Sequence, residues 1–251
     1  YIRVTPALNV KTHEGKLKIK LGFTGLKDSS QLQLAITITE ENQRTQQTIY
    51  QRTQKPGWQN NEAVVDIVLP KINPWHFDRP DLYRIDVRVV SGKKISDHIS
   101  TTTGFREILF TGGKTWLNGE YIRLMGVEWT AGSNPDYGFA ETDSVILSQC
   151  RLMKEVNAIF TRQHFQQDEL FYDFCDRKGI LIQQEVPLWG PETPANDTIR
   201  HIALQQMERM ILNNYNHPSI FSWGTGNELR GRDPDIKKLI TELIAKARTT
   251  D

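Results

Sequence analysis

The segment with the clearest chemical potential is the run NHPSIFSWGTGNE, which covers residues 216–228. A short apolar stretch ends at Trp223, a Gly-Thr-Gly turn follows, and Asn227 then stands next to Glu228. Glycosyl transfer to water needs a carboxylic acid that protonates the leaving oxygen, and a neighbouring donor that holds a ring hydroxyl while charge builds at the anomeric carbon. Glu228 and Asn227 are residues of these two types. The competing interpretation is that Glu228 is an inert, solvated loop carboxylate, as most surface glutamates are.

Polar and aromatic residues recur where other apolar runs end. The runs 122–129, 158–165, 180–186 and 220–223 have the short, continuous apolar character of buried parallel strands. Groups that converge on one rim of such a sheet would form a pocket of the size of a sugar. The residues at or just after the ends of the runs are Glu128, Trp129, His164, Glu185, Trp189, Trp223, Asn227 and Glu228.

Each of these runs is followed by apolar residues at helical spacing. Asp143, Asp168 and Asp233 are placed to cap the first, second and fourth helices, and Pro234 suits the first turn of the fourth. Strand and helix therefore alternate four times between about Tyr121 and the last residue.

This alternation fits either an open doubly wound sheet or a (β/α)8 barrel, and periodicity alone does not choose between them. A barrel places its chemistry at the C-terminal ends of its strands, where the polar residues of this chain lie. A whole barrel needs about 250 residues, so residues 121–251 have room for about half of one. The pattern favours the first four βα units of a barrel.

The first hundred residues show a period of two instead. Apolar and polar residues alternate in four stretches, which begin at Leu17, Leu32, Val65 and Tyr83. Short strands with one wet face, separated by turns, are typical of an antiparallel sandwich. No catalytic motif stands out in this region.

The composition argues against several classes of protein. Among 251 residues, 31 are Lys or Arg and 30 are Asp or Glu, so a formal net charge of +1 gives no field that would attract nucleic acid or anionic lipid. No apolar run approaches the roughly 18 residues that span a bilayer. Cys150 and Cys175 lack the spacing of a zinc or redox motif, and we expect both in the core.

The first residue is Tyr1, and no secretory leader pattern follows it. We therefore expect the chain to be a piece of a longer protein, and its compartment stays open.

Several further motifs occur in a fixed order along the chain. Gly104-Phe105-Arg106 precedes Trp116-Leu117-Asn118-Gly119-Glu120 and Leu124-Met125-Gly126-Val127, and then come Leu152-Met153-Lys154, His164, the run 171–176 and Gly179-Ile180. With Asn227-Glu228 at the end of the series, the chain resembles glycoside hydrolase family 2, the family of β-galactosidases, β-glucuronidases and β-mannosidases. The resemblance implies an immunoglobulin-like β-sandwich over residues 1–106. It implies the N-terminal half of a TIM-barrel catalytic domain over residues 107–251.

The same resemblance implies roles for residues of the site. Glu228 would be the catalytic acid/base, and Asn227 the partner of the sugar 2-hydroxyl. The implied substrate-binding residues are Asn227, His164, Arg162, Glu185, Trp189 and Trp223. Two alternatives stay open: His164 as a hydrogen-bonded wall residue that never touches sugar, and either tryptophan as simple core.

Two stretches depart from the family pattern. Glu128-Trp129-Thr130 stands where many members have Asn, Arg and His, and the residues before His164 also differ from the usual ones. The hydroxyl contacts and the metal dependence of the well-known β-galactosidases therefore do not carry over, and we expect neither a metal nor a cofactor.

The leading hypothesis is a retaining hydrolase of terminal β-linked sugars, of β-galactosidase type. The family takes its nucleophile from the seventh barrel strand, so we expect no nucleophile in this chain and no activity from the chain alone. The alternatives are a non-catalytic carbohydrate-binding or scaffold protein of the same fold, and hydrolysis within polysaccharides. A carbohydrate is the expected partner, without nucleic acid or membrane, and unpaired strand edges favour a homo-oligomer.

Overall fold

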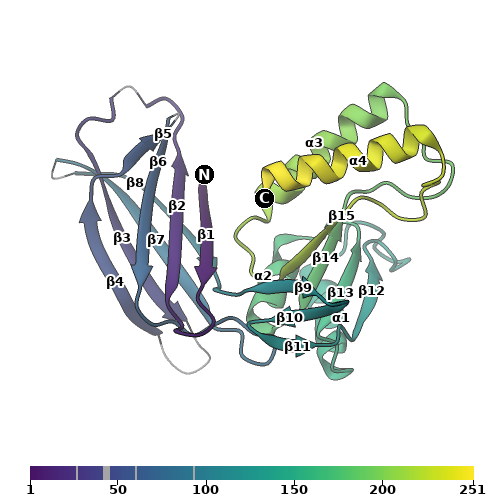
Figure 1. Ribbon diagram of the computed structural model, residues 1–251, viewed down its shortest axis with the longest axis horizontal. Coiled ribbons are helices and arrows are strands. Elements are labelled where there is room, and N and C mark those ends of the chain that lie inside the picture. Colours follow the sequence, from purple (N-terminus) through teal and green to yellow (C-terminus); the bar gives the residue numbers. More distant parts are fainter. Residues whose placement is uncertain (27, 42–45, 60, 93) are drawn as a thin grey trace. The chain divides into compact units, whose positions relative to one another are not determined.

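The structure, a computed structural model, describes residues 1–26, 28–41, 46–59, 61–92 and 94–251. It divides into two compact units. The first consists of Tyr1–Arg123 with Asn216–Pro218, and the second of Leu124–Tyr215 with Ser219–Asp251. Antiparallel strands make up the first unit, and strands that alternate with helices make up the second (Figure 1).

Two four-stranded antiparallel sheets form the body of the first unit, as the period of two predicts. Each strand points one row of side chains into a shared core, in which Val4, Leu17, Ile36 and Ile85 are fully or almost fully buried. The strand order is β1-β2-β6-β5 in one sheet and β4-β3-β7-β8 in the other. The strands are β1 (Ile2–Leu8), β2 (Gly15–Gly22), β3 (Leu32–Glu41), β4 (Gln46–Gln54), β5 (Gly57–Gln59), β6 (Glu62–Leu69), β7 (Leu82–Ser91) and β8 (Lys94–Thr103).

A small antiparallel sheet completes the first unit, with β9 (Ile108–Thr111), β10 (Lys114–Leu117) and β11 (Glu120–Ile122) in the order β11-β10-β9. The prediction of one strand over residues 122–129 is wrong, because Ile122 ends β11 and the next strand begins at Gly126. The apolar run is continuous in sequence, but the boundary between the two units falls inside it, at Arg123 and Leu124.

The second unit contains a four-stranded parallel sheet in the order β12-β13-β14-β15. Each strand is followed by a helix, which confirms the predicted four βα units. The strands are β12 (Gly126–Thr130), β13 (Phe160–His164), β14 (Leu181–Glu185) and β15 (Ile220–Gly224). The helices are α1 (Asp143–Glu155), α2 (Glu169–Lys178), α3 (Asp197–Asn213) and α4 (Pro234–Thr250).

Two apolar clusters join helices to this sheet. Ile146, Phe171 and Ile182 are members of the cluster of α1, α2 and the strands. Met207 and Leu243 are members of the cluster of α3 and α4, which lie side by side (Figure 1). The helices therefore pack on one face of the sheet, and the side chains on its other face are available to form a site.

The helix ends follow from local side chains. Asp168 and Asp233 cap α2 and α4 as predicted, because each carboxylate accepts a hydrogen bond from a main-chain N–H of the first turn. The prediction of Asp143 as the cap of α1 is wrong. Thr142 occupies that position without a side-chain cap bond, and Asp143 is the first helical residue.

Both cysteines are buried thiols in the second unit, as expected. Burial raises the pKa of Cys150 to about 12 and holds the pKa of Cys175 well above its ordinary value. In the described part of the chain, no helix combines the length and the apolar character that crossing a bilayer requires.

Candidate active site

The candidate site lies at the C-terminal ends of the four parallel strands. In register, Glu128 of β12 lies beside Arg162 of β13, and Glu185 of β14 lies beside Gly224 of β15. Side chains two residues apart on a strand share a face, so Arg162 and His164 point to the same side of the sheet. The register therefore brings basic and acidic side chains from three strands together at one rim.

Arg162 is the centre of the hydrogen-bond network at this rim. Its Nη1 donates to Glu128 Oε2 at 3.2 Å, and its Nη2 donates to both carboxylate oxygens of Glu185 at 3.1 Å. The same Nη2 donates to Asn227 Oδ1 at 2.8 Å, 65 residues along the chain. One guanidinium thus fixes three side chains from three different segments, through charge-assisted bonds.

His164 lies between the two carboxylates that Arg162 also contacts. Its Nδ1 is 2.8 Å from Glu128 Oε1, and its Nε2 is 2.6 Å from Glu185 Oε1. Both ring nitrogens are therefore engaged, which fixes the plane of the imidazole. The side chain is only 9% exposed, so His164 forms part of the wall of the site.

Glu185 is the most buried acid of the rim, with a side-chain exposure of 1%. Burial raises its pKa, Arg162 and His164 oppose that rise, and the neighbouring Glu128 adds to it. The carboxylate lies directly against Gly224, where an added Cβ would be 2.6 Å from Glu185 Cβ. Gly224 is thus required because any side chain there would displace Glu185.

Asn227 and Glu228 follow β15 and are held by the loop after β14. Asn227 N–H donates to Leu188 O at 2.8 Å, and Gly190 N–H donates to Asn227 O at 3.0 Å. Glu228 has a φ of 54°, in the left-handed region that non-glycine residues rarely adopt. Trp189 Nε1–H donates to Glu228 Oε2 at 3.2 Å, and its own ring is 66% exposed. An exposed indole therefore lies beside an exposed carboxylate, and the carboxylate belongs to a residue with a strained backbone. Residues with strained backbones are often found at functional sites.

The described rim residues are bonded to one another and do not gather three ligand atoms around a common point. Carboxylates, an amide, an imidazole and aromatic rings at the open ends of strands are the groups that bind and hydrolyse sugars. This arrangement can transfer a proton at Glu228 and hold ring hydroxyls at its neighbours.

Comparison with known proteins gives two family matches. The profile described as "Glycosyl hydrolases family 2" matches residues 1–106, and the profile described as "Glycosyl hydrolases family 2, TIM barrel domain" matches residues 108–251. The chain belongs to glycosyl hydrolase family 2. Its parallel sheet is therefore the first half of the barrel of that family.

Relatives within family 2 are several times longer than this chain. A β-galactosidase of Thermoanaerobacter pseudethanolicus is 31% identical over 188 residues, which cover 74% of this chain and 25% of that protein. A β-galactosidase of Thermoanaerobacterium thermosulfurigenes is 33% identical over 178 residues, covering 68% of this chain and 24% of that protein. The chain thus spans about a quarter of the length of these relatives.

Solved structures of the family share the fold. An FMN-binding β-glucuronidase from Facaelibacterium prausnitzii matches with a TM-score of 0.86 and 25% identity, over 100% of this chain and 38% of the other. A β-glucuronidase of Bifidobacterium dentium, solved with coumarin-3-O-glucuronide, matches with a TM-score of 0.87 and 20% identity, over 100% and 42% of the two chains.

The structure brings most of the predicted site residues together at the C-terminal ends of the parallel strands. Arg162, His164, Glu185 and Asn227 form one network, and Glu228 is joined to Trp189. Trp223 is the one predicted substrate-binding residue that does not join this group. In register it lies beside Gln184, whose side chain points to the helices, and its ring packs against both helix clusters.

Sequence reasoning missed the part that Glu128 plays in this network. The sequence placed Glu128 among the polar residues at the strand ends and marked it as a departure from the family pattern, but it assigned the residue no contact and no role. Its position was the available signal, because a carboxylate on the strand next to that of Arg162 can pair with the guanidinium. Only the register between β12 and β13 turns that position into a contact.

Proposed function

We propose that this chain carries the acid/base half of the active site of a retaining β-glycosidase, with Glu228 as general acid and base. The observation that carries the proposal is the placement of Asn227 and Glu228, in a family 2 chain, beside the Arg162 network at the C-terminal rim of the sheet. The substrate class is a terminal β-linked sugar.

Glu228 acts in both chemical steps of the proposed reaction. First, its carboxylic acid gives a proton to the glycosidic oxygen while a second carboxylate bonds to the anomeric carbon and the leaving group departs. Then its carboxylate takes a proton from the water that attacks the same carbon and releases the second carboxylate. The Trp189 N–H on Oε2 holds the group in place and leaves Oε1 for this proton transfer.

Asn227 is oriented for its proposed partner, the sugar 2-hydroxyl. Because Arg162 donates to Oδ1, the oxygen of the amide is occupied and its NH2 group is directed away from the guanidinium. A donor presented in this way strengthens its bond to a 2-hydroxyl as the transition state develops. Arg162 acts through Asn227 and is a positioning residue.

A retaining mechanism needs a second carboxylate about 5 to 5.5 Å from the first. Glu185 is unsuited because it is 1% exposed, and Glu128 is engaged by both Arg162 and His164. Family 2 enzymes take their nucleophile from the seventh barrel strand, whereas this chain supplies four βα units, so we propose that the nucleophile lies outside these 251 residues. It follows that the chain alone does not turn over substrate. Residues 1–106 and 107–251 remain our proposed division into sandwich and catalytic modules, and the two family matches support it.

The first experiment compares leaving groups in a longer protein, in which the chain is extended through the remaining barrel strands. We expect Glu228→Ala to cut hydrolysis of poor leaving groups far more than hydrolysis of activated aryl β-glycosides, and we expect azide to restore part of the activity on the activated substrates. Glu155→Ala, at the end of α1, is the matched control and should match the wild type. Equal losses on both kinds of substrate would remove Glu228 from the acid role.

A second experiment separates the finer parts of the proposal. A panel of aryl β-galactosides, β-glucuronides and β-mannosides on the longer protein identifies the sugar, and the 251-residue chain assayed beside it should show no turnover. Turnover by the short chain that Glu228→Gln abolishes would mean that the nucleophile lies within it. Sugar binding without turnover in the longer protein would favour the non-catalytic alternative.

A further inference from the structure

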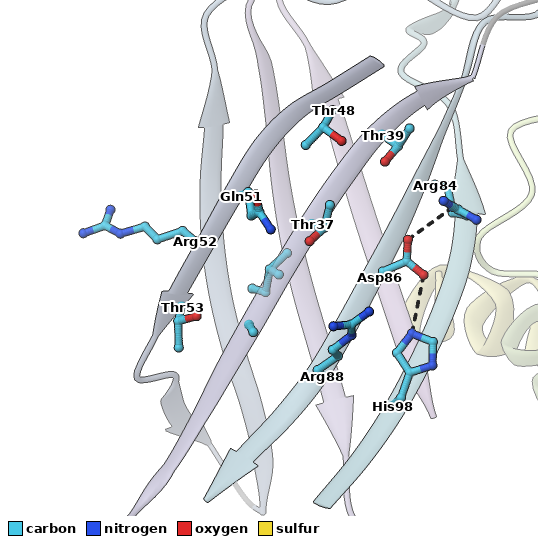
Figure 2. A pocket seen from close by; sticks show the side chains of 12 residues that line it. Thr37, Thr39, Thr48, Gln51, Arg52, Thr53, Arg84, Asp86, Arg88 and His98 are labelled. Carbon is cyan, nitrogen blue, oxygen red and sulfur yellow. Dashed lines mark ion pairs between the residues drawn. The ribbon is translucent and has the colours of Figure 1, made fainter. Parts of the chain in front are cut away.

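A polar hollow of about 760 Å³ lies on the outer face of the sheet β4-β3-β7-β8, within the first unit (Figure 2). Its volume falls in the range of small-molecule sites, roughly 300 to 1,000 Å³. It belongs to the sandwich and contains none of the residues of the proposed glycosidase site.

The strand register explains why this face is polar throughout. Ile36, Ile38 and Ile85 point into the core, so their neighbours in sequence point outward. The outward residues of β4, β3, β7 and β8 form three cross-strand rows: Thr48, Thr39, Arg84 and Thr102; Gln51, Thr37, Asp86 and Ser100; Thr53, Ala35, Arg88 and His98.

The same rows explain why the face is hollow. Strand β3, which lies between β4 and β7, contributes the short side chains of Ala35 and Thr37, whereas β4 contributes Gln51 and β7 contributes Arg88. Long side chains thus stand on both sides of short ones. The floor of the hollow presents hydroxyl groups, and its walls present an amide and guanidinium groups.

Asp86 is the one acidic residue among the described residues that line the hollow, and it compensates the charge of Arg84. Arg84 Nε lies 3.2 Å from Asp86 Oδ2, and His98 Nε2 lies 3.4 Å from Asp86 Oδ1, as the dashed lines in Figure 2 mark. Arg88 is different, because no ion pair links it to another residue in the described ranges. Arg52 also borders the hollow, but its side chain points away from it (Figure 2).

We propose that this hollow binds a uronic acid residue of an oligosaccharide, with Arg88 pairing with the sugar carboxylate and Thr37, Thr39 and Gln51 bonding ring hydroxyls. A guanidinium matches a planar carboxylate with two parallel hydrogen bonds. Hydroxyl and amide side chains both donate and accept, as sugar hydroxyls require. Arg52 points away from the hollow, so Arg88 presents one uncompensated cation to it, which suits one acidic group, whereas nucleic acid would need several phosphate contacts.

The residues that line the hollow are mostly polar, and they set how a uronic acid would be held there. The lining residues in the described part of the sheet include no Trp, Tyr or Phe, so recognition there rests on hydrogen bonds and charge and not on ring stacking. A neutral sugar would leave Arg88 unpaired on binding. The inference does not depend on the role of Glu228.

The test measures binding of trigalacturonate to the 251-residue chain by isothermal titration calorimetry, with neutral galactotriose, a sulfated galactose trisaccharide and tripolyphosphate as comparisons. We expect trigalacturonate to bind at least tenfold more tightly than each of these. Tighter binding of the sulfated sugar or of tripolyphosphate would overturn the uronate assignment. Absence of trigalacturonate binding would overturn the site itself.

Matched variants locate the bound sugar. Arg88→Gln should weaken trigalacturonate at least tenfold and Thr37→Val severalfold. Arg52→Gln removes the same charge from the same sheet and should stay within twofold of the wild type. Equal losses of trigalacturonate affinity in the two arginine variants would mean that the sheet attracts anions without a specific site, which would overturn the proposal. Loss of binding in Asn227→Ala would place the sugar at the strand ends and overturn the proposal.

Discussion

The same three residue types, an arginine, a histidine and a carboxylate, meet in both units of this chain. On the sandwich, Arg84 and His98 share Asp86 at 3.2 and 3.4 Å. The side chains of Arg84, Asp86 and His98 are 47%, 22% and 50% exposed. They lie in the middle of antiparallel strands, where each pair competes with water.

At the parallel sheet, Arg162 and His164 share Glu185 at 3.1 and 2.6 Å. The exposures of Arg162, His164 and Glu185 fall to 26%, 9% and 1%. These residues lie at the ends of parallel strands, where they pack against one another, Glu128 and Gly224. In this cluster, burial raises the pKa of Glu185.

The comparison teaches that burial, and not residue type, decides what such a cluster does. Exposed ion pairs contribute about 0 to 1 kcal/mol, because water screens them and holding long side chains costs entropy. A buried pair contributes little when intact, but removal of one partner leaves an unpaired charge and costs about 3 to 5 kcal/mol. Loss of one partner should therefore cost far more in the buried cluster than in the exposed one.

The largest expected effect is that of Arg162→Ala. It leaves Glu185 buried without its guanidinium, and we expect the second unit to lose about 3 kcal/mol of unfolding free energy, toward the low end of the range because Arg162 is partly exposed. Urea unfolding followed by circular dichroism at 222 nm measures this, since α1 to α4 all lie in that unit.

Two companion variants test the cause. Arg84→Ala, followed by amide hydrogen exchange of β7 and β8, should cost no more than about 1 kcal/mol. Adding Glu185→Gln to Arg162→Ala should recover a large part of the loss, because the unpaired charge is gone. Equal losses at Arg162 and Arg84 would mean that burial does not separate the two clusters.

The next effect comes from the glycine that makes room for the buried acid. In Gly224→Ala the new Cβ would meet Glu185 Cβ at 2.6 Å and Oε2 at 3.0 Å, so Glu185 must move. We expect a loss of about 1 to 3 kcal/mol, as for other overpacked sites. Gly57→Ala is the control in the sandwich, because its Cβ would meet only Val64 O at 3.6 Å. That variant should be neutral or slightly stabilising in the same hydrogen-exchange assay.

The fold was largely predictable because its two parts have different periodicities. Alternation with a period of two identified the sandwich strands, and helical spacing after short apolar runs identified the four βα units. The error at residues 122–129 arose because apolar character continues across a unit boundary that only tertiary contacts define. Thr142 and Asp143 are both good cap residues, and sequence preference could not choose between adjacent positions.

The candidate site was predictable in its membership but not in its contacts. Strand ends pointed to His164, Glu185, Asn227 and Glu228. The bond from Arg162 to Asn227 joins residues 65 positions apart and depends on which strands are neighbours. The direction of Trp223 depends on register, since a shift of one residue reverses the face on which a side chain lies.

A smaller effect is expected from relieving the left-handed turn at the site. Glu228 has a φ of 54°, and its side chain does not bond the main chain of its own turn, so Glu228→Gly should stabilise the second unit by about 1 kcal/mol. Asn118 has a φ of 51° but donates to Trp75 O at 2.9 Å and accepts from Glu107 N–H at 2.9 Å. Asn118→Gly should therefore be neutral or destabilising. Urea unfolding at 222 nm measures Glu228→Gly, and amide hydrogen exchange of β10 and β11 measures Asn118→Gly in the first unit. Destabilisation by Glu228→Gly would contradict the prediction.

The smallest expected effect is a pH dependence of stability that arises at Glu185 in the buried cluster. The pKa of Glu185 is raised by burial, so the folded chain keeps this proton after the unfolded chain has released it. Stability should therefore fall as pH rises from the ordinary glutamate pKa, about 4.3, to the raised pKa of the folded chain, and then level off. Glu185→Gln removes this titration, so its unfolding free energy relative to that of the wild type should increase with pH across that window.

Asp86→Asn, in the exposed cluster, is the control and should shift stability by no more than about 0.5 kcal/mol, and added salt should reduce that shift. Urea midpoints between about pH 4 and pH 7 measure both variants, and a relative stability of Glu185→Gln that declines with pH would show that Arg162 outweighs burial at this carboxylate.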